Sequence, residues 1–279
     1  MKTAGFTHSE GEQSNMDEIA KYNVERWRAL VEARALYTRP LLDLDEAAAR
    51  ALVDPRGWFG ELKDRRVLCL ASGGGRESAG FALLGARVTV FDLSEEQLGQ
   101  DRRAAAHYGF EVETVRGDMR DLSALDAEAF DVVSHSYSIN FVPDSNAVFR
   151  GVARVLRRGG LYRFMCANPF VMGLSAGDWD GEGYALKAPY VEGARVLGVD
   201  EDWVYERDGR AAISPPVEYR HGLGAVVAGL FGNGLRIERV SEDEAMRPDP
   251  KAEPGAWDHF MHYVRPWLTF LARRDASAT

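Results

Sequence analysis

Apolar runs alternate with amphipathic stretches through the middle of the chain, a pattern typical of βαβ units. Predicted strands occupy the apolar runs 66–71, 87–92, 111–116, 130–136 and 161–167. Predicted helices occupy 78–85, 94–109 and 145–156. The strands are apolar on both faces, as in a parallel sheet that helices cover on both sides. The pattern therefore predicts an α/β, doubly wound, Rossmann-like core over residues 66–168, in which Gly159-Gly160 forms the turn before the fifth strand.

Helical spacing also marks the region before this core. A helix is predicted behind Asn15, with Glu18 at the capping-box position, and a second from Asp45 to Val53. Residues 16–65 are thus predicted to form a helical appendage that follows a mobile polar tail, 1–15.

The periodicity fails after the fifth strand and returns only near residue 221. Residues 169–220 interleave aromatic residues with glycine, proline and acids, and a long irregular segment of this kind predicts an inserted substrate cap. Residues 221–275 are predicted to complete the core sheet with a helix at 223–231 and strands at 235–240 and 268–273.

Composition limits the function classes. The chain has 279 residues, 46% of them hydrophobic, and needs neither disulfide nor metal to build a core. The two cysteines are far apart, no leader-like segment opens the chain, and no apolar stretch is long enough to span a bilayer, so we expect a cytoplasmic protein with no membrane partner. The net charge of -9 disfavours nucleic acid. The expected state is a monomer or homodimer.

Cofactor chemistry is indicated at the carboxyl ends of the first three strands. The first strand runs into Ala71, Ser72, Gly73 and Gly75, a turn that lets bare backbone approach a ligand. Asp92 ends the second strand, where a carboxylate can accept ribose hydroxyls. Nicotinamide and flavin proteins share these features. However, Ser78 stands where their third glycine would be, and the third strand ends in a second acid, within Gly117-Asp118-Met119.

With these strand ends and the strings Phe130-Asp131-Val132-Val133 and Val155-Leu156-Arg157-Arg158-Gly159-Gly160, residues 66–168 resemble the class I S-adenosylmethionine (SAM)-dependent methyltransferases. The resemblance implies a seven-stranded sheet with its last strand antiparallel, and SAM as cofactor with S-adenosylhomocysteine as product. It also implies a role for each cofactor-site residue: Gly73 and Gly75 border the methionine part, Asp92 holds the ribose, Leu93 and Met119 sandwich the adenine, and Asp118 contacts its amino group. Ala71, Ser72, Gln97, Gly117 and His135 are assigned to the same site.

The chain departs from that family pattern at two positions. The family commonly has an acid where this chain has Cys69, and a glycine where it has Ala71. The acid helps to hold the cofactor's ammonium group. A carbonyl, a water or a side chain from the N-terminal helix is expected to replace it, and Cys69 is expected to be a small core residue.

Two histidines are the candidates for a general base. His135 lies at the end of the fourth strand and His221 at the point where the cap rejoins the core. Each has a structural alternative: His135 can shape the cofactor pocket without reacting, and His221 can cap a helix. Tyr22 and Trp27 are assigned to the cofactor site through a cation–π contact with the sulfonium, with core packing as the alternative.

Other aromatic and histidine residues leave the interpretation open. Trp179, Tyr184 and Trp203 can either line an acceptor pocket or pack the cap on itself. His259 and His262 are expected to be surface residues of a short helix, and no metal site is predicted. The predicted function is methyl transfer from SAM to O, N or S of a small molecule. A catalytically silent SAM-binding protein and an NAD-type oxidoreductase are the alternatives.

Overall fold

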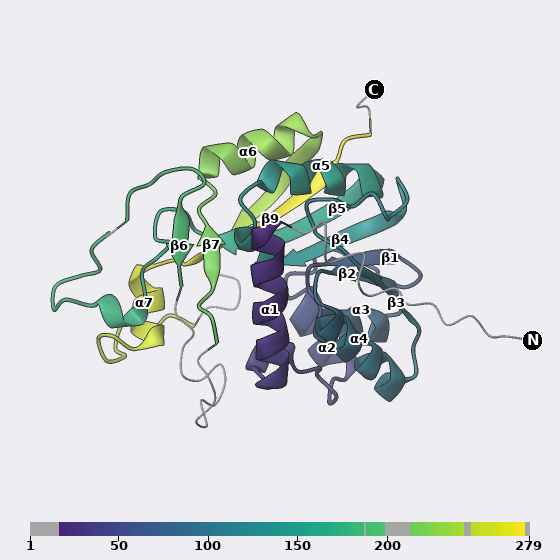
Figure 1. Cartoon of the computed structure of the whole chain (residues 1–279), viewed down its shortest axis with the longest axis horizontal. Coiled ribbons are helices and arrows are strands. Elements are labelled where there is room, and N and C mark those ends of the chain that lie inside the picture. Colours follow the sequence, from purple (N-terminus) through teal and green to yellow (C-terminus); the bar gives the residue numbers. More distant parts are fainter. Residues whose placement is uncertain (1–16, 187, 199–212, 243–246, 277–279) are drawn as a thin grey trace, which may run out of the picture.

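The computed structural model describes residues 17–186, 188–198, 213–242 and 247–276, and a twisted sheet runs through its centre (Figure 1). The strand order is β3-β2-β1-β4-β5-β9-β8, and within the described residues β9 alone runs opposite to the other strands of this sheet. The strands are β1 (Arg66–Leu70), β2 (Arg87–Asp92), β3 (Val112–Arg116), β4 (Phe130–Ser136), β5 (Leu156–Ala167), β8 (Leu235–Ser241) and β9 (Trp267–Arg274). This confirms the predicted seven-stranded sheet with its last strand antiparallel.

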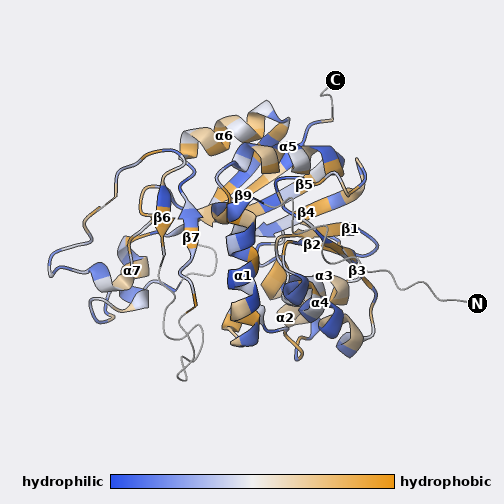
Figure 2. Cartoon of the chain, in the orientation of Figure 1, coloured by the Kyte–Doolittle hydropathy of each residue, from blue (hydrophilic) through white to orange (hydrophobic). Residues whose placement is uncertain are grey.

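Helices cover the sheet on both sides and bury two apolar layers. The helices are α2 (Glu46–Val53), α3 (Glu77–Leu83), α4 (Glu95–Tyr108), α5 (Ser145–Val155) and α6 (Leu223–Gly232). Alternate residues of β1 point to opposite faces: Leu68 packs in the layer that contains residues of α5 and α6, whereas Val67 packs with residues of α2, α3 and α4. In the hydropathy colouring the strands carry both hydrophobic and hydrophilic residues, and the covering helix α6 is largely hydrophobic (Figure 2).

Local capping chemistry sets several helix ends where the sequence predicts them. Asp45 caps α2 by accepting the Ala48 amide, and Ser94 caps α4 by accepting the Gln97 amide at 3.2 Å. Gly109 ends α4 in the left-handed region, at φ +74°.

Two predicted boundaries are wrong. The N-terminal helix α1 (Glu18–Glu32) is capped by Asp17, whereas the predicted cap Asn15 lies outside the described residues. The Gly159-Gly160 pair does not separate α5 from β5: strand β5 starts at Leu156 and runs through both glycines, and the register against β4 shifts there. Glycine is compatible with such a bulge, so the two glycines interrupt the regular pairing of β5 without ending the strand.

The segment predicted to be an irregular cap has regular structure of its own. It contains the short helix η4 (Ala176–Asp178), and β6 (Arg195–Leu197) pairs antiparallel with β7 (Val217–Tyr219) in a separate two-stranded sheet. This sheet lies beside α1 in Figure 1, and α7 (Trp257–Tyr263) lies farther to the left in the same view. Across the described ranges, the helices are all too short or too polar to cross a bilayer.

Candidate active site

Asp92 stands at the carboxyl end of β2 and is held by backbone amides. The Gly73 amide donates to Asp92 Oδ2 and the Ser94 amide to Oδ1, each at 2.9 Å. The side chain is buried, and this burial raises the pKa of Asp92. Each carboxylate oxygen keeps a second lone pair, so the group can still accept hydroxyl donors from a ligand.

Asp101 of α4 braces the glycine turn from behind. Its carboxylate accepts the Gly74 amide at 2.9 Å, the Gly75 amide at 3.0 Å and the Ser78 hydroxyl at 2.5 Å. Burial raises the pKa of Asp101 to about 7. The amides of Gly73, Gly74 and Gly75 are therefore all paired within the protein. Asp101 was missed, although an acid three residues beyond Leu98 falls on the buried face of this helix.

The turn packs so closely on α4 that its glycines are required. A Cβ on Gly75 would lie 2.6 Å from the Gln100 carbonyl oxygen, and one on Gly73 would lie 2.7 Å from Gln97 Cβ. Beside the turn, Gln97 Oε1 is buried and has no hydrogen-bond partner within the described part of the chain. A buried acceptor of this kind fits a ligand that brings donors, as a ribose or an ammonium group does.

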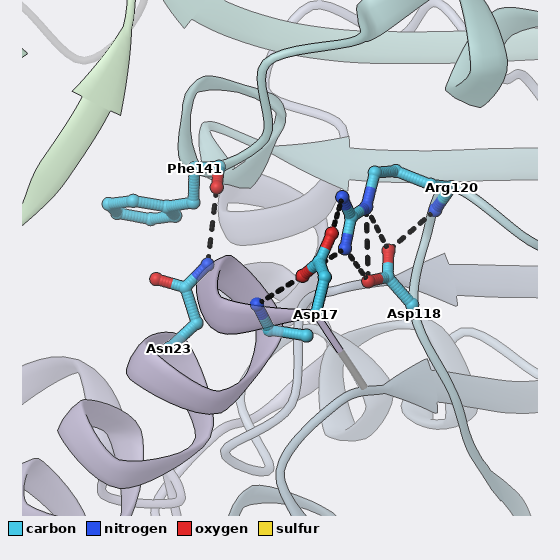
Figure 3. A network of polar contacts seen from close by, with 6 residues as sticks. Asp17, Asn23, Asp118, Arg120 and Phe141 are labelled. Atoms are coloured by element: carbon cyan, nitrogen blue, oxygen red, sulfur yellow. Dashed lines mark hydrogen bonds and ion pairs between the residues drawn. The ribbon is translucent and has the colours of Figure 1, made fainter. Parts of the chain in front are cut away.

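Asp118 follows β3 and is joined to the N-terminal helix through Arg120 (Figure 3). Arg120 Nε lies 3.0 and 3.1 Å from the two Asp118 oxygens, and Arg120 Nη1 lies 2.7 Å from Asp17 Oδ2. The two carboxylates raise the pKa of Arg120. Farther along α1, the Asn23 amide donates to the Phe141 carbonyl at 3.1 Å. The predicted adenine contact thus also serves as an anchor for α1.

The remaining predicted cofactor residues gather at the same edge of the sheet. Leu93 and Met119 are half-buried after β2 and β3. The Gly117 amide donates to the Asp92 carbonyl at 3.0 Å, and a Cβ there would come within 2.3 Å of the Phe91 ring. Ala71 adopts φ +46°, a left-handed conformation that disfavours any residue but glycine, and the Ser72 hydroxyl donates to the Leu70 carbonyl.

A carboxylate stands beside Cys69, although not on β1. Cys69 is fully buried and is the register partner of Ser134 on β4. The Ser134 and Ser136 hydroxyls both donate to the carboxylate of Glu77, at 2.9 Å for Ser134, and burial together with the Glu77 charge raises the pKa of Cys69. Glu77 was missed because an acid in the first turn of a helix has an ordinary explanation in the helix dipole.

Both predicted catalytic histidines lie in the interior. His135 Nδ1 is 2.9 Å from the Tyr162 hydroxyl, its Nε2 has no partner among the described residues, and burial lowers the pKa of His135 to about 3. His221 Nε2 donates to the Ile139 carbonyl at 3.1 Å, and its Nδ1 lies 3.8 Å from Glu192 Oε1. Their catalytic roles stay predictions, and a proton acceptor with the pKa of His135 is a weak one.

Tyr22 holds α1 against the returning end of the cap, and Trp27 holds it against Phe141 of the core. The Tyr22 hydroxyl donates to the Pro215 carbonyl at 2.6 Å, and the Trp27 ring meets Phe141 edge to face, with centroids 5.8 Å apart. A contact of either ring with the cofactor stays a prediction.

The cap aromatics that the structure describes pack on α7. Trp179 and Tyr184 contact each other and His259, whose Nδ1 lies 3.1 Å from the Tyr184 hydroxyl. The expectation that His259 is a surface residue is wrong, since it is buried in this cluster, whereas His262 is exposed. Trp203 lies outside the described residues.

Comparison with known proteins agrees with this geometry. Residues 68–164 match the family model described as a methyltransferase domain. An uncharacterized methyltransferase of Bacillus subtilis, YbaJ, is 44% identical over 117 residues, which cover 42% of this chain and 46% of YbaJ. The ubiquinone biosynthesis O-methyltransferase of Xanthomonas axonopodis pv. citri is 32% identical over 148 residues, 53% of this chain and 58% of that enzyme. The matches span about half the length of these curated relatives.

Solved structures extend the likeness over most of the chain. A SAM-dependent methyltransferase from Mesorhizobium loti is 26% identical with a TM-score of 0.58, and the match covers 84% of this chain and all of that one. A putative SAM-dependent methyltransferase from Listeria monocytogenes, 20% identical with a TM-score of 0.61, shares the fold over 82% of this chain and 99% of that one. Residues 68–164 are therefore a class I SAM-dependent methyltransferase domain, which confirms the predicted class and its cofactor.

Proposed function

We propose that this protein transfers the methyl group of SAM to O, N or S of a small-molecule acceptor. The observation that carries the proposal is Asp92, buried at the tip of β2, fixed by the Gly73 and Ser94 amides and still able to accept ribose hydroxyls. When SAM is bound, its sulfonium supplies an already activated methyl group. The protein's main contribution is then to orient the two reactants and to exclude water, which is worth on the order of 7 to 11 kcal/mol when the alignment is good.

We further assign Glu77 as the counter-ion of the cofactor's ammonium group, in place of an acid on β1. Glu77 follows Gly75 by two residues, and the hydroxyls of Ser134 and Ser136 hold its carboxylate against β4. The seryl hydroxyls keep the carboxylate beside Cys69, next to the turn that borders the cofactor. This differs from the expected carbonyl, water or N-terminal side chain.

A small-molecule acceptor is supported by the cap and by charge. The β6–β7 sheet of the cap lies beside α1, and the net charge of -9 opposes a polyanionic substrate (Figure 1). Cytoplasmic location is supported by the two buried, unpaired cysteines.

Ligand-dependent melting of the full chain tests the cofactor assignment. S-adenosylhomocysteine is expected to raise the melting temperature, and NAD is expected to leave it unchanged. Stabilisation by NAD alone would reject the proposal. Stabilisation by S-adenosylhomocysteine, without consumption of SAM by any acceptor, would favour the catalytically silent alternative.

Glu77→Gln tests the counter-ion, with the exposed Glu111→Gln as its matched control. The first variant is expected to bind S-adenosylhomocysteine about ten-fold or more weakly, because a hydrogen bond to a charged group contributes about 1.5 to 3 kcal/mol. Its affinity for 5′-methylthioadenosine, which has no ammonium group, is expected to be unchanged. Equal losses for both ligands in calorimetry would contradict the assignment.

A further inference from the structure

The cap contributes a carboxylate of its own, that of Glu218, which is not among the predicted site residues. Glu218 lies on β7 and is half-buried, and the Tyr137 hydroxyl donates to its Oε2 at 3.1 Å. Tyr137 directly follows β4 and adopts φ +58°, which a bulky residue rarely does. Strained backbone of this kind persists only where the surrounding structure imposes it, and it is common at functional sites.

Among the described residues, two polar groups act on Glu218. Tyr137 donates its hydroxyl from the start of η3 (Ser138–Phe141), and Arg26 of α1 acts on it electrostatically. On the neighbouring cap strand its register partner is the apolar Val196. Burial raises the pKa of Glu218, and the tyrosine bond and the arginine charge oppose this shift only in part.

The Tyr137–Glu218 pair adjoins the cofactor turn. Ser136, the residue before Tyr137, donates to Glu77, which begins the helix after the glycine turn. On the other side, the Asn140 amide donates to the Tyr219 carbonyl at 3.2 Å and fixes β7 against η3. The pair therefore joins the end of β4, next to the cofactor turn, to the cap strand β7, and an acceptor must lie in this region to meet the methyl donor.

We propose that Glu218, oriented by Tyr137, is the general base for an acceptor that carries a hydroxyl on an aromatic ring; this inference rests on the proposed methyl transfer. The hydroxyl oxygen forms the bond to the methyl carbon, the electron pair of the broken carbon–sulfur bond stays on sulfur, and the hydroxyl proton passes to the Glu218 carboxylate. Tyr137 is a positioning residue, which holds the carboxylate toward the acceptor.

Charge and shape select the acceptor class. Arg26 already places a positive charge near Glu218, and this disfavours a cationic amine beside it. Aromatic rings line the same region: Phe141 meets both Trp27 and Tyr137 edge to face, with centroids 5.8 and 6.2 Å apart. Rings arranged in this way favour another aromatic ring.

The kinetic test uses Glu218→Gln in the full chain, with the exposed cap residue Glu182→Gln as its control. Each variant is incubated with SAM and a panel of simple phenols and catechols, arylamines and thiophenols, and S-adenosylhomocysteine is measured. Phenols and catechols are expected to react. Glu218→Gln is expected to lower kcat about a hundred-fold or more while the Kd for S-adenosylhomocysteine stays unchanged. The wild-type rate is expected to rise as the pH passes through the pKa of Glu218. This rise in the pH–rate profile is expected to be absent in Glu218→Gln.

A second readout does not depend on turnover. In protein labelled with 13C at Cζ of tyrosine, the Tyr137 resonance, assigned with Tyr137→Phe, is expected to shift with pH as Glu218 titrates above the usual range of a glutamate. The shift is expected to vanish in Glu218→Gln. Its persistence there would show that another group titrates beside Tyr137.

Several outcomes would overturn the inference. They are a wild-type rate in Glu218→Gln, loss of the rise in the pH–rate profile in His221→Asn instead, methylation of amines or thiols alone, and no reaction with any panel compound although S-adenosylhomocysteine binds. Failure of the wild-type chain to bind S-adenosylhomocysteine would instead reject the proposed function itself, so the two failures are distinguishable.

Discussion

The cofactor edge and the acceptor side of this site are assembled differently. In the glycine turn of the cofactor edge, hydrogen bonds join residues that are close in sequence: Gly73 with Asp92, 19 positions apart, and Gly74 with Asp101, 27 positions apart. On the acceptor side the partners are remote: 81 positions separate Tyr137 from Glu218, and 193 separate Tyr22 from Pro215. The first region is the product of consecutive βαβ units, whereas the second exists only when α1, η3 and the cap meet.

This difference explains which part of the chain is shared with other methyltransferases. The family model covers residues 68–164, so it includes the cofactor turn and Asp92 but neither α1 nor β7. Because methyltransferases share the methyl donor, a shared motif can bind it, whereas each methyl acceptor needs its own set of binding side chains. The comparison therefore predicts that the cofactor edge is rigid and locally determined, and that the acceptor side is loosely coupled to it.

The largest expected effect concerns Asp101 and the pH dependence of stability. Its pKa is about 7 in the folded chain and about 3.9 in an unfolded chain, so the folded state binds the extra proton between these values. Its contribution to stability is complete below about pH 4 and is lost as the pH rises through 7. Urea unfolding of wild type and Asp101→Asn is expected to show the wild-type advantage falling by about 3 kcal/mol between pH 4.5 and 7.5.

The matched control for this experiment is Asp126→Asn, because Asp126 is exposed. It is expected to follow the wild-type curve at both pH values. A difference in stability between wild type and Asp101→Asn that does not change with pH would show that Asp101 titrates normally. It would contradict a protonated Asp101 behind the glycine turn.

Asp92→Ala is expected to have the next largest effect, on cofactor affinity. The change removes the hydrogen bonds offered to the ribose and releases the Gly73 and Ser94 amides. At about 1.5 to 3 kcal/mol for a hydrogen bond to a charged group, the Kd for S-adenosylhomocysteine is expected to rise about ten-fold or more. Calorimetry on this variant and on Asp126→Ala measures it. Unchanged affinity would remove Asp92 from the ribose site.

The strands that end at the cofactor edge were predicted well because their signals are local. The apolar runs that end at Asp92 and at Ser136 match β2 and β4 residue for residue. The turn predicted at Gly159-Gly160 is wrong because a glycine pair fits a bulge as well as a turn. The cap of α1 is Asp17 and not the predicted Asn15. Asp17 also pairs with Arg120, which is more than a hundred positions away in the sequence.

The acceptor side could not be predicted in the same way. Glu218 lies in a short strand, and the residues next to it in sequence give no indication that it contacts Tyr137. His221 was predicted instead from its residue type and from its position where the cap rejoins the core. The contact that gives Glu218 its chemistry forms only when the cap folds back on η3. Tertiary assembly of this kind leaves no periodic signal in the chain.

A smaller effect is expected from Asp17→Ala, which tests whether the two regions are coupled through α1. The change removes the helix cap and the contact with Arg120, and we expect a loss of about 1 kcal/mol in stability. Hydrogen exchange is expected to accelerate in α1 but not in β1 or β4, and the exposed Glu18→Gln serves as control. Faster exchange throughout the sheet would contradict the loose coupling of the two regions.

The smallest effect is expected at Ala71, where the turn begins. At φ +46° an alanine is strained by roughly 1 kcal/mol, whereas glycine is not, although glycine loses more entropy on folding. Ala71→Gly is thus expected to change the free energy of unfolding by less than about 1 kcal/mol, toward stability. Gly74→Ala is the matched opposite, because its φ is +115° and its Cβ would lie 3.0 Å from the Tyr37 carbonyl oxygen, so it is expected to destabilise. Urea denaturation of both variants measures the pair. Destabilisation by Ala71→Gly would mean that the alanine methyl group contributes packing that outweighs its backbone strain, and that the cofactor edge is less locally determined than its short-range hydrogen bonds indicate.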